Sequence, residues 1–135
     1  MIPRVYSPQI YSIFRIVAGF MWLFHGLQKI FGMYDGNAAQ FGTLRWLAGA
    51  IELGAGALIV VGLFTAFAAF IASGQMAFAY FMSHQPRGFW PVENGGELAA
   101  LYCFVFLFIA SYGPGPWSLD AMRKRTSVAL RESPV

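Results

Sequence analysis

An acidic residue near the middle of an apolar segment constrains this chain more than any other feature. The segment, LRWLAGAIELGAGALIVV at residues 44–61, is long enough to cross a membrane as a helix, and it contains Glu52. A carboxylate at that depth costs about 2.5–3.5 kcal/mol on insertion scales. Glu52 therefore requires a partner, a proton or a water-filled cavity. Ala48, Gly49 and Gly56 share its helical face, which favours close helix packing over lipid contact.

The composition excludes an ordinary soluble domain. Hydrophobic residues make up 58% of the 135 positions and charged residues only 11%, against roughly 25% charged in soluble domains. A soluble chain of this length could not bury so much apolar surface. The sequence predicts an all-α integral membrane protein, an antiparallel four-helix bundle that forms one membrane domain over residues 1–135. A nucleic-acid partner is not expected, because the membrane segments leave no basic surface large enough to follow a phosphate backbone.

Four apolar segments are predicted to span the bilayer, at about residues 10–30, 44–61, 64–81 and 97–112. Gly62 is expected to end the second span, and the short link after it makes the second and third spans antiparallel neighbours. Arg4 and a basic tail, residues 121–135, lie at opposite ends of the chain. The positive-inside rule then predicts that both termini are cytoplasmic.

The first span carries a polar stripe. Arg15, Trp22 and Lys29 recur every seven residues and share a helical face, with His25 at its edge. This spacing predicts that the stripe points into the bundle. The alternatives are that Lys29 extends to the membrane edge and that Arg15 extends to the inner surface. A further expectation is that Arg15 pairs with Glu52, either within a functional site or only to stabilise the fold.

Later segments add polar groups at defined depths. Counted from the turn that joins the second and third spans, Gln75 reaches about the depth of Glu52, which predicts a hydrogen bond between them. The alternative is a Gln75 bonded to neighbouring backbone. Asn94 and Glu97 lie at the outer end of the fourth span, where a carboxylate also suits a helix N-terminus. Polar groups should therefore gather in the outer half of the bundle with Glu52 at the floor, as in many ligand, ion or proton sites.

Several kinds of chemistry have no signature in the sequence. His25 and His84 could meet only through space, so no metal ligand is predicted. Cys103 is the one cysteine, which excludes an internal disulfide and a CxxC thiol pair. Catalytic triads, phosphate-binding glycine loops and dinucleotide fingerprints are also missing.

Four stretches in this order carry a resemblance: RIVAGFMWLFHGLQKIFG at 15–32, ELGAGALIVVGLFTAFAA at 52–69, NGGELAALY at 94–102 and GPGPWSLD at 113–120. With them the chain resembles the DoxX family of small four-span bacterial membrane proteins. The matching motif positions are Arg15, His25, Gly26, Lys29, Glu52, Asn94, Glu97 and Asp120. The resemblance implies a multi-pass protein of the bacterial inner (plasma) membrane. Relatives are associated with quinone-linked oxidation of sulfur compounds, with quinone detoxification or with partner redox enzymes.

The first functional hypothesis is a quinone-interacting subunit or component of an oxidoreductase, with a quinone as its cofactor. Glu52 and His25 are the expected catalytic residues, because Glu52 could supply or accept the proton that quinone reduction requires. The expected ligand-binding residues are Arg15, Lys29, Gln75, Asn94 and Glu97. No residue pattern supplies an electron carrier, so a redox protein partner is expected.

Two other hypotheses stay open. The protein is a non-enzymatic membrane partner or scaffold for a redox protein, contacting it through the loop at 83–96 or the tail at 121–135, or it is a small transporter of a lipophilic solute. Exposed Gly and Ala faces would permit a homo-oligomer. Asp120 is expected to act as a local cap or as a tether for the basic tail.

Overall fold

The computed structural model describes residues 3–132, with side chains through residue 128, and every regular element in that part is helical. The helices are α1 (Ser7–Phe31), α2 (Leu44–Val61), α3 (Thr65–Ala79), α4 (Pro91–Asn94), α5 (Glu97–Tyr112) and α6 (Leu119–Glu132).

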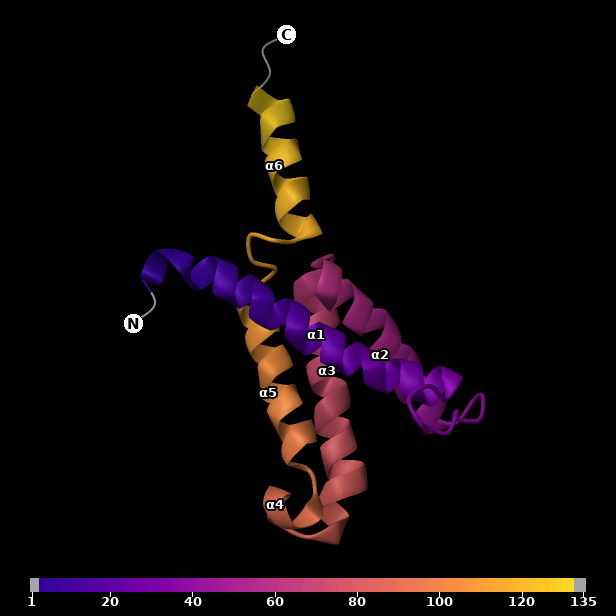
Figure 1. Cartoon of the computed structure of the whole chain (residues 1–135). Coiled ribbons are helices and arrows are strands. Elements are labelled where there is room, and N and C mark those ends of the chain that lie inside the picture. The colour runs from indigo at the N-terminus through magenta and orange to yellow at the C-terminus, as the bar shows by residue number, and fades with distance from the viewer. Residues whose placement is uncertain (1–2, 133–135) are drawn as a thin grey trace.

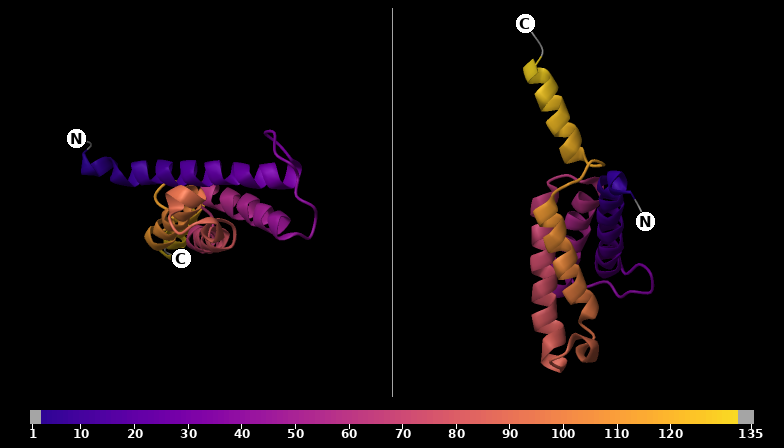
Figure 2. Two further views of the ribbon diagram at one scale, coloured as in Figure 1. Left: turned by 90° about the horizontal axis from the view of Figure 1, so that it is seen from below. Right: turned by 90° about the vertical axis from the view of Figure 1, so that its left-hand side faces the viewer.

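The helices form a membrane bundle, as the sequence predicted. Three helical stretches are long and apolar enough to cross a membrane, Arg4–Phe31, Leu44–Val61 and Thr65–Arg87, and the apolar α5 is a shorter fourth. Helices α1 and α2 form one antiparallel pair, and α3 and α5 form a second (Figure 1). The first pair crosses the second, so that α1 lies at a wide angle to α3 and α5 (Figure 2). The cytoplasmic location of both termini stays a prediction.

Small residues let α1 and α2 approach closely. A Cβ on Gly26 would lie 2.6 Å from the backbone nitrogen of Leu53, and one on Gly49 would lie 2.8 Å from the Cβ of Lys29. Gly49 and Gly56 are buried, so the predicted small-residue face of α2 is a helix contact. This close approach brings the polar stripe of α1 against the face of α2 that carries Glu52.

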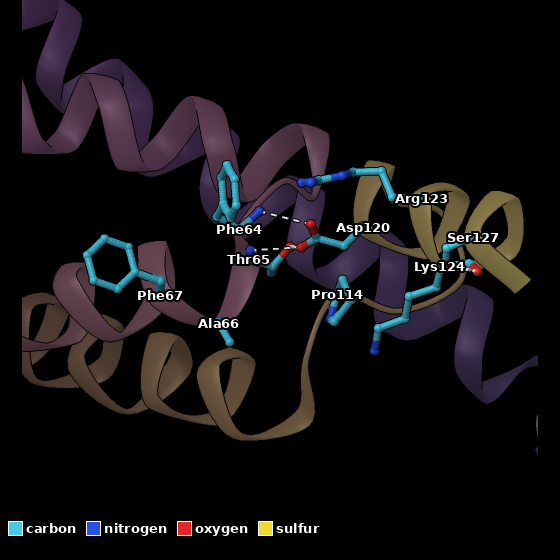
Figure 3. Close-up of a pocket in the computed structure, with 9 residues that line it drawn as sticks. All are labelled: Phe64, Thr65, Ala66, Phe67, Pro114, Asp120, Arg123, Lys124 and Ser127. Carbon is cyan, nitrogen blue, oxygen red and sulfur yellow. Dashed lines mark hydrogen bonds between the residues drawn. The ribbon is translucent and has the colours of Figure 1, made fainter.

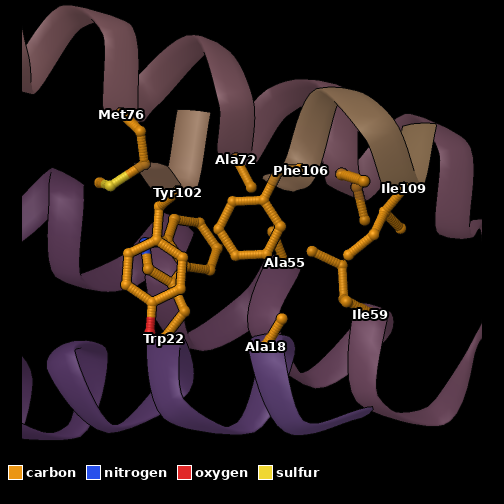
Figure 4. Close-up of a cluster of buried hydrophobic side chains, with 11 residues drawn as sticks. Ala18, Trp22, Ala55, Ile59, Ala72, Met76, Tyr102, Phe106 and Ile109 are labelled. Carbon is orange, nitrogen blue, oxygen red and sulfur yellow. The ribbon is translucent and has the colours of Figure 1, made fainter. Parts of the chain in front are cut away.

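The core lies where the two helix pairs cross. The Trp22 ring of α1 packs on Phe106 of α5 with 4.8 Å between centroids, and Phe106 stacks on Tyr102 at 5.4 Å. Alanines of α2 and α3 fill the remaining space around these rings (Figure 4). The aromatic contacts therefore join α1 to α5, which belong to different pairs.

Helix ends follow local chemistry. Gly62 ends α2 in the left-handed conformation with φ 71°, and its N–H donates to the carbonyl of Leu58, which confirms the predicted helix stop. At the other end of α2 the Thr43 hydroxyl accepts from the N–H of Trp46 at 3.3 Å. The link after Gly62 is short, so the start of α3 lies directly beside the end of α2.

Two segments contain more helix than the sequence predicted. The range 83–96, expected to be a loop, contains the end of a π-helical turn (Tyr80–His84), a 3-10 turn (Gln85–Arg87) and α4. The tail at 121–135 continues α6 through Glu132, and residues 133–135 lie outside the described part. Helix α6 extends away from the bundle (Figure 1).

Candidate functional site

Three helices meet at the buried carboxylate of Glu52. Its side chain is 1% exposed, and Lys29 of α1 forms an ion pair with its Oε1 atom. Gln75 of α3 donates to the same oxygen from Nε2 at 3.0 Å, so the predicted Gln75–Glu52 hydrogen bond is confirmed. The side chain of Lys29 keeps 26% exposure, but its ammonium group is bound inside the bundle, not free at the membrane edge.

The predicted pairing of Arg15 with Glu52 is wrong. Arg15 donates to the backbone carbonyls of Ile59 and Val60 at the end of α2 and to that of Trp117 before α6. Because α1 and α2 run antiparallel, Arg15 lies beside the carbonyl end of α2, whose last carbonyls have no partner within the helix. Arg15 is completely buried, so it does not extend as a free side chain to the inner surface, which was the alternative interpretation.

A cavity of about 220 Å³ lies beside the Lys29–Glu52 pair. Side chains from α1, α2, α3 and α5 and from the segment before α5 line it: Trp22, His25, Lys29, Glu52, Met76, Ala79, His84, Gly95, Leu98, Ala99 and Tyr102. Most of these side chains are apolar or aromatic. The lining therefore combines a charged pair and two imidazoles with an otherwise apolar wall.

Two buried polar atoms of the lining residues have no hydrogen-bond partner in the described part of the chain. They are Oε2 of Glu52 and Nε1 of Trp22, and each of these residues is 1% exposed. Unpaired buried polar groups are costly and need an explanation, such as a ligand or an ordered water. The carboxylate oxygen is an acceptor and the indole N–H is a donor, so together they could bind a molecule that carries both functions.

The structure brings only some of the predicted site residues to the cavity. His25, Lys29 and Glu52 line it, and Gln75 is joined to it through Glu52. Arg15, Asn94 and Glu97 are not among its lining residues. Glu97 is the exposed first residue of α5. This agrees with the alternative interpretation, in which Glu97 is an acidic residue that suits the N-terminus of a helix.

Asn94 organises the chain segment before α5. Its side-chain amide donates to the carbonyl of Gly88 at 2.8 Å and to the hydroxyl of Tyr80 at 3.3 Å. Its Oδ1 accepts from the N–H of Gly96 at 2.8 Å. These bonds use its polar atoms within the turn, so Asn94 positions the segment that carries Gly95 at the cavity.

Sequence reasoning missed two kinds of lining residue. Trp22 was placed in the polar stripe but not assigned to the site, although its face indicated the bundle interior. Leu98 and Tyr102 belong to an apolar helix without strong periodicity, and nothing local marks which of its faces meets α1. Their assignment required the crossing of the two helix pairs.

A second polar cluster lies at the opposite end of α2, where α3 begins. The Asp120 carboxylate accepts from the N–H groups of Phe64 and Thr65 and from the Thr65 hydroxyl, each at 3.0 Å (Figure 3). Asp120 thus caps α3 from 55 positions away. The expectation of a tether for the tail is confirmed, and that of a sequence-local cap is wrong.

Hydrogen bonding sets the protonation of Asp120. Burial raises the pKa of this carboxyl, but the hydrogen bonds from Thr65 and Phe64 and the charge of Arg123 lower it by more, so its pKa lies below the ordinary value. Arg123 also lies over the ring of Phe64, 5.3 Å from its centroid. The cluster therefore holds the start of α6 against the α2–α3 turn.

The fold and the site define a multi-pass membrane protein whose helices enclose a charged pair beside a small cavity. The DoxX family model matches residues 10–85, and the chain belongs to the DoxX family. An uncharacterized protein of Haemophilus influenzae Rd is 40% identical to it over 122 residues, which cover 85% of this chain and 91% of that protein. No solved structure matches the chain.

Proposed function

We propose that this protein binds a quinone in the cavity beside Lys29 and Glu52 and acts as a quinone-interacting component of a membrane oxidoreductase. The observation that supports this most is the pair of buried atoms without a partner in the described residues, Glu52 Oε2 and Trp22 Nε1, at a cavity whose remaining wall is mostly apolar. A quinone ring requires apolar walls with a few polar groups for its oxygens. The residues that line the cavity meet both requirements.

The lining residues suggest distinct roles. The indole N–H of Trp22 and the ammonium group of Lys29 are donors for quinone oxygens, and the positive charge of Lys29 would stabilise negative charge that develops there. Glu52 would transfer a proton through its free Oε2 atom, and His25 would supply or accept another. Gln75 positions the carboxylate by its bond to Oε1.

The electrons must come from outside the chain, because its described residues suggest no redox group. A redox protein that docks near the cavity is the proposed donor. Phe89, Trp90 and Val92 support this, since they are 72%, 59% and 72% exposed between His84 and α5. An exposed apolar cluster of this kind also suits the alternative function, a non-enzymatic scaffold for a redox protein.

Mass spectrometry of co-purifying lipids tests the proposal. Wild type, Glu52→Gln and Ser73→Ala would be purified side by side in mild detergent with an unrelated membrane protein. Ser73 is a matched control because it is buried, donates to the Cys103 carbonyl at 2.8 Å and does not line the cavity. We expect near-stoichiometric quinone on wild type and Ser73→Ala, and loss of quinone from Glu52→Gln.

Other outcomes separate the alternatives. Quinone at the level of the unrelated protein would contradict the proposal. Loss of a redox partner on Trp90→Ala, with no quinone on wild type, would instead support the scaffold. Loss of solute efflux in Glu52→Gln without a redox defect would support a transporter.

A further inference from the structure

An apolar groove of about 450 Å³ adjoins the proposed quinone cavity. Helix α1 lines it between Ile10 and Met21, and α5 lines it between Leu98 and Val105. Helix α1 lies at a wide angle to α5, so the two helices diverge on either side of their contact (Figure 2). All the lining side chains are apolar except for the hydroxyl of Tyr102.

The groove and the cavity share two lining residues, Leu98 and Tyr102. The Tyr102 ring packs beside Trp22 with its hydroxyl directed toward α1 (Figure 4). The cavity and the groove are therefore neighbours on either side of Leu98 and Tyr102. The cavity and the groove differ in chemistry. The charged pair lines the cavity, whereas almost only hydrocarbon side chains line the groove.

The size of the cavity limits what it can hold. Its volume of about 220 Å³ is below the 300–1,000 Å³ typical of ligand pockets. A substituted ring fits that volume, but a long chain attached to the ring must lie elsewhere. The adjoining groove is the apolar space that such a chain would enter.

We propose that the groove between α1 and α5 binds the isoprenoid chain of the quinone, so that the protein selects quinones with a long apolar chain over chainless quinones. This inference rests on the proposed function. The shared lining at Leu98 and Tyr102 assigns the groove to the chain of the same ligand, which would pass beside these two side chains, and not to a separate phospholipid.

Two probes with the same ring test the inference. One is 2,3-dimethoxy-5-methyl-1,4-benzoquinone, and the other carries an isoprenoid side chain on that ring. Equilibrium binding of each would be measured on the full chain in nanodiscs of constant lipid composition. Each affinity would be referred to the concentration of the probe in the nanodisc lipid, so that partitioning of the chain into the bilayer is not counted as binding. On that scale we expect the tailed quinone to bind at least about tenfold more tightly, which corresponds to 1.4 kcal/mol.

Matched tryptophan substitutions isolate the groove. Leu101→Trp and Val17→Trp would fill it from its two sides, at side chains that are 61% and 47% exposed and can enlarge without disturbing the core. Leu107→Trp is the control, because Leu107 is 43% exposed on the same helix but does not line the groove. Thermal unfolding would check that each variant is folded.

We expect the groove variants to lose the advantage of the tailed quinone and to keep the affinity for the chainless one, while Leu107→Trp retains both. Equal binding of the two probes to wild type would overturn the inference and leave the proposed function standing. A groove variant that weakens both probes equally, or native mass spectrometry that finds a phospholipid in place of the tailed quinone, would also overturn it. Failure of wild type to bind either probe would overturn the proposed function itself.

Discussion

Two polar clusters lie along the same pair of helices, and they differ in how completely the protein satisfies them. At one end, Arg15 donates to three backbone carbonyls, and among its nitrogens only Nε has no partner within residues 3–132. At the other end, Glu52 binds Lys29 and Gln75 through one oxygen and leaves the other unpartnered beside a cavity. Both clusters bury a charge, but the polar contacts of Arg15 go to backbone carbonyls, whereas Glu52 lines a cavity with an oxygen that has no partner in the described residues.

The comparison separates a structural charge from a charge available to a ligand. The carbonyls that bind Arg15 come from the end of α2 and from the link before α6, so this cluster holds two chain segments together. Asp120 strengthens the same end by capping α3. The Glu52 cluster joins helices too, but its unpartnered oxygen at the cavity is unnecessary for packing and suits binding or proton transfer.

The largest expected effect comes from removing the structural charge. Arg15→Met should lower the free energy of unfolding by about 3–5 kcal/mol, because buried carbonyls would lose a charged donor. Denaturant titration in detergent would measure it, with the exposed Arg87→Met as control. If Arg15→Met unfolds at the same denaturant concentration as wild type, the Arg15 cluster does not stabilise the fold.

The next largest effect is expected at Asp120, which lies at the same end of the bundle as Arg15. Asp120→Asn should cost about 1–2 kcal/mol, since the cap of α3 loses its charge. The lowered pKa of Asp120 gives the stabilisation a pH dependence. It is complete above the ordinary carboxyl pKa and disappears as the pH falls through the lowered value of the folded protein.

Thermal unfolding across an acidic pH series would check this sign. The difference between wild type and Asp120→Asn should be constant near neutral pH and shrink on acidification. Asp35→Asn, in the exposed link after α1, serves as control and should show no such difference. A difference that grows as the pH falls would contradict the assigned role.

At the cavity the pattern should reverse. Glu52→Gln keeps the shape of the side chain and an oxygen that can accept from Gln75, but it removes the charge that pairs with the part-exposed Lys29, so we expect a stability loss of about 1–2 kcal/mol. Quinone retention should fall to the background level, as measured by mass spectrometry of the purified protein. A variant that unfolds like Arg15→Met would assign Glu52 to structure and remove the distinction between the clusters.

The smallest effect on stability is expected at the junction of cavity and groove. Tyr102→Phe keeps the ring that stacks on Phe106, so the free energy of unfolding should change by less than about 1 kcal/mol. Quinone affinity should fall several-fold if the hydroxyl binds a ring oxygen. Equilibrium binding of the tailed quinone would measure it, and unchanged affinity would exclude that contact.

The success at Gln75 and the error at Arg15 have one physical explanation. Glu52 and Gln75 lie on helices joined by a short turn, so counting residues from the turn sets their relative depth. Helices α1 and α2 are joined by the longer segment 32–43, which leaves their axial shift undefined. The sequence could therefore predict that Arg15 and Lys29 face the bundle, but not which of them reaches Glu52.

By itself the sequence determined the membrane class, the main helices and the need of Glu52 for a partner, because hydropathy and helical periodicity are local properties. Only the tertiary structure decided that Lys29 is that partner, that Arg15 binds the end of α2, and that Tyr102 lines both the cavity and the groove. Those outcomes depend on how far the helices slide and rotate against one another. Close contacts such as that of Gly26 with α2 set this arrangement across the whole bundle.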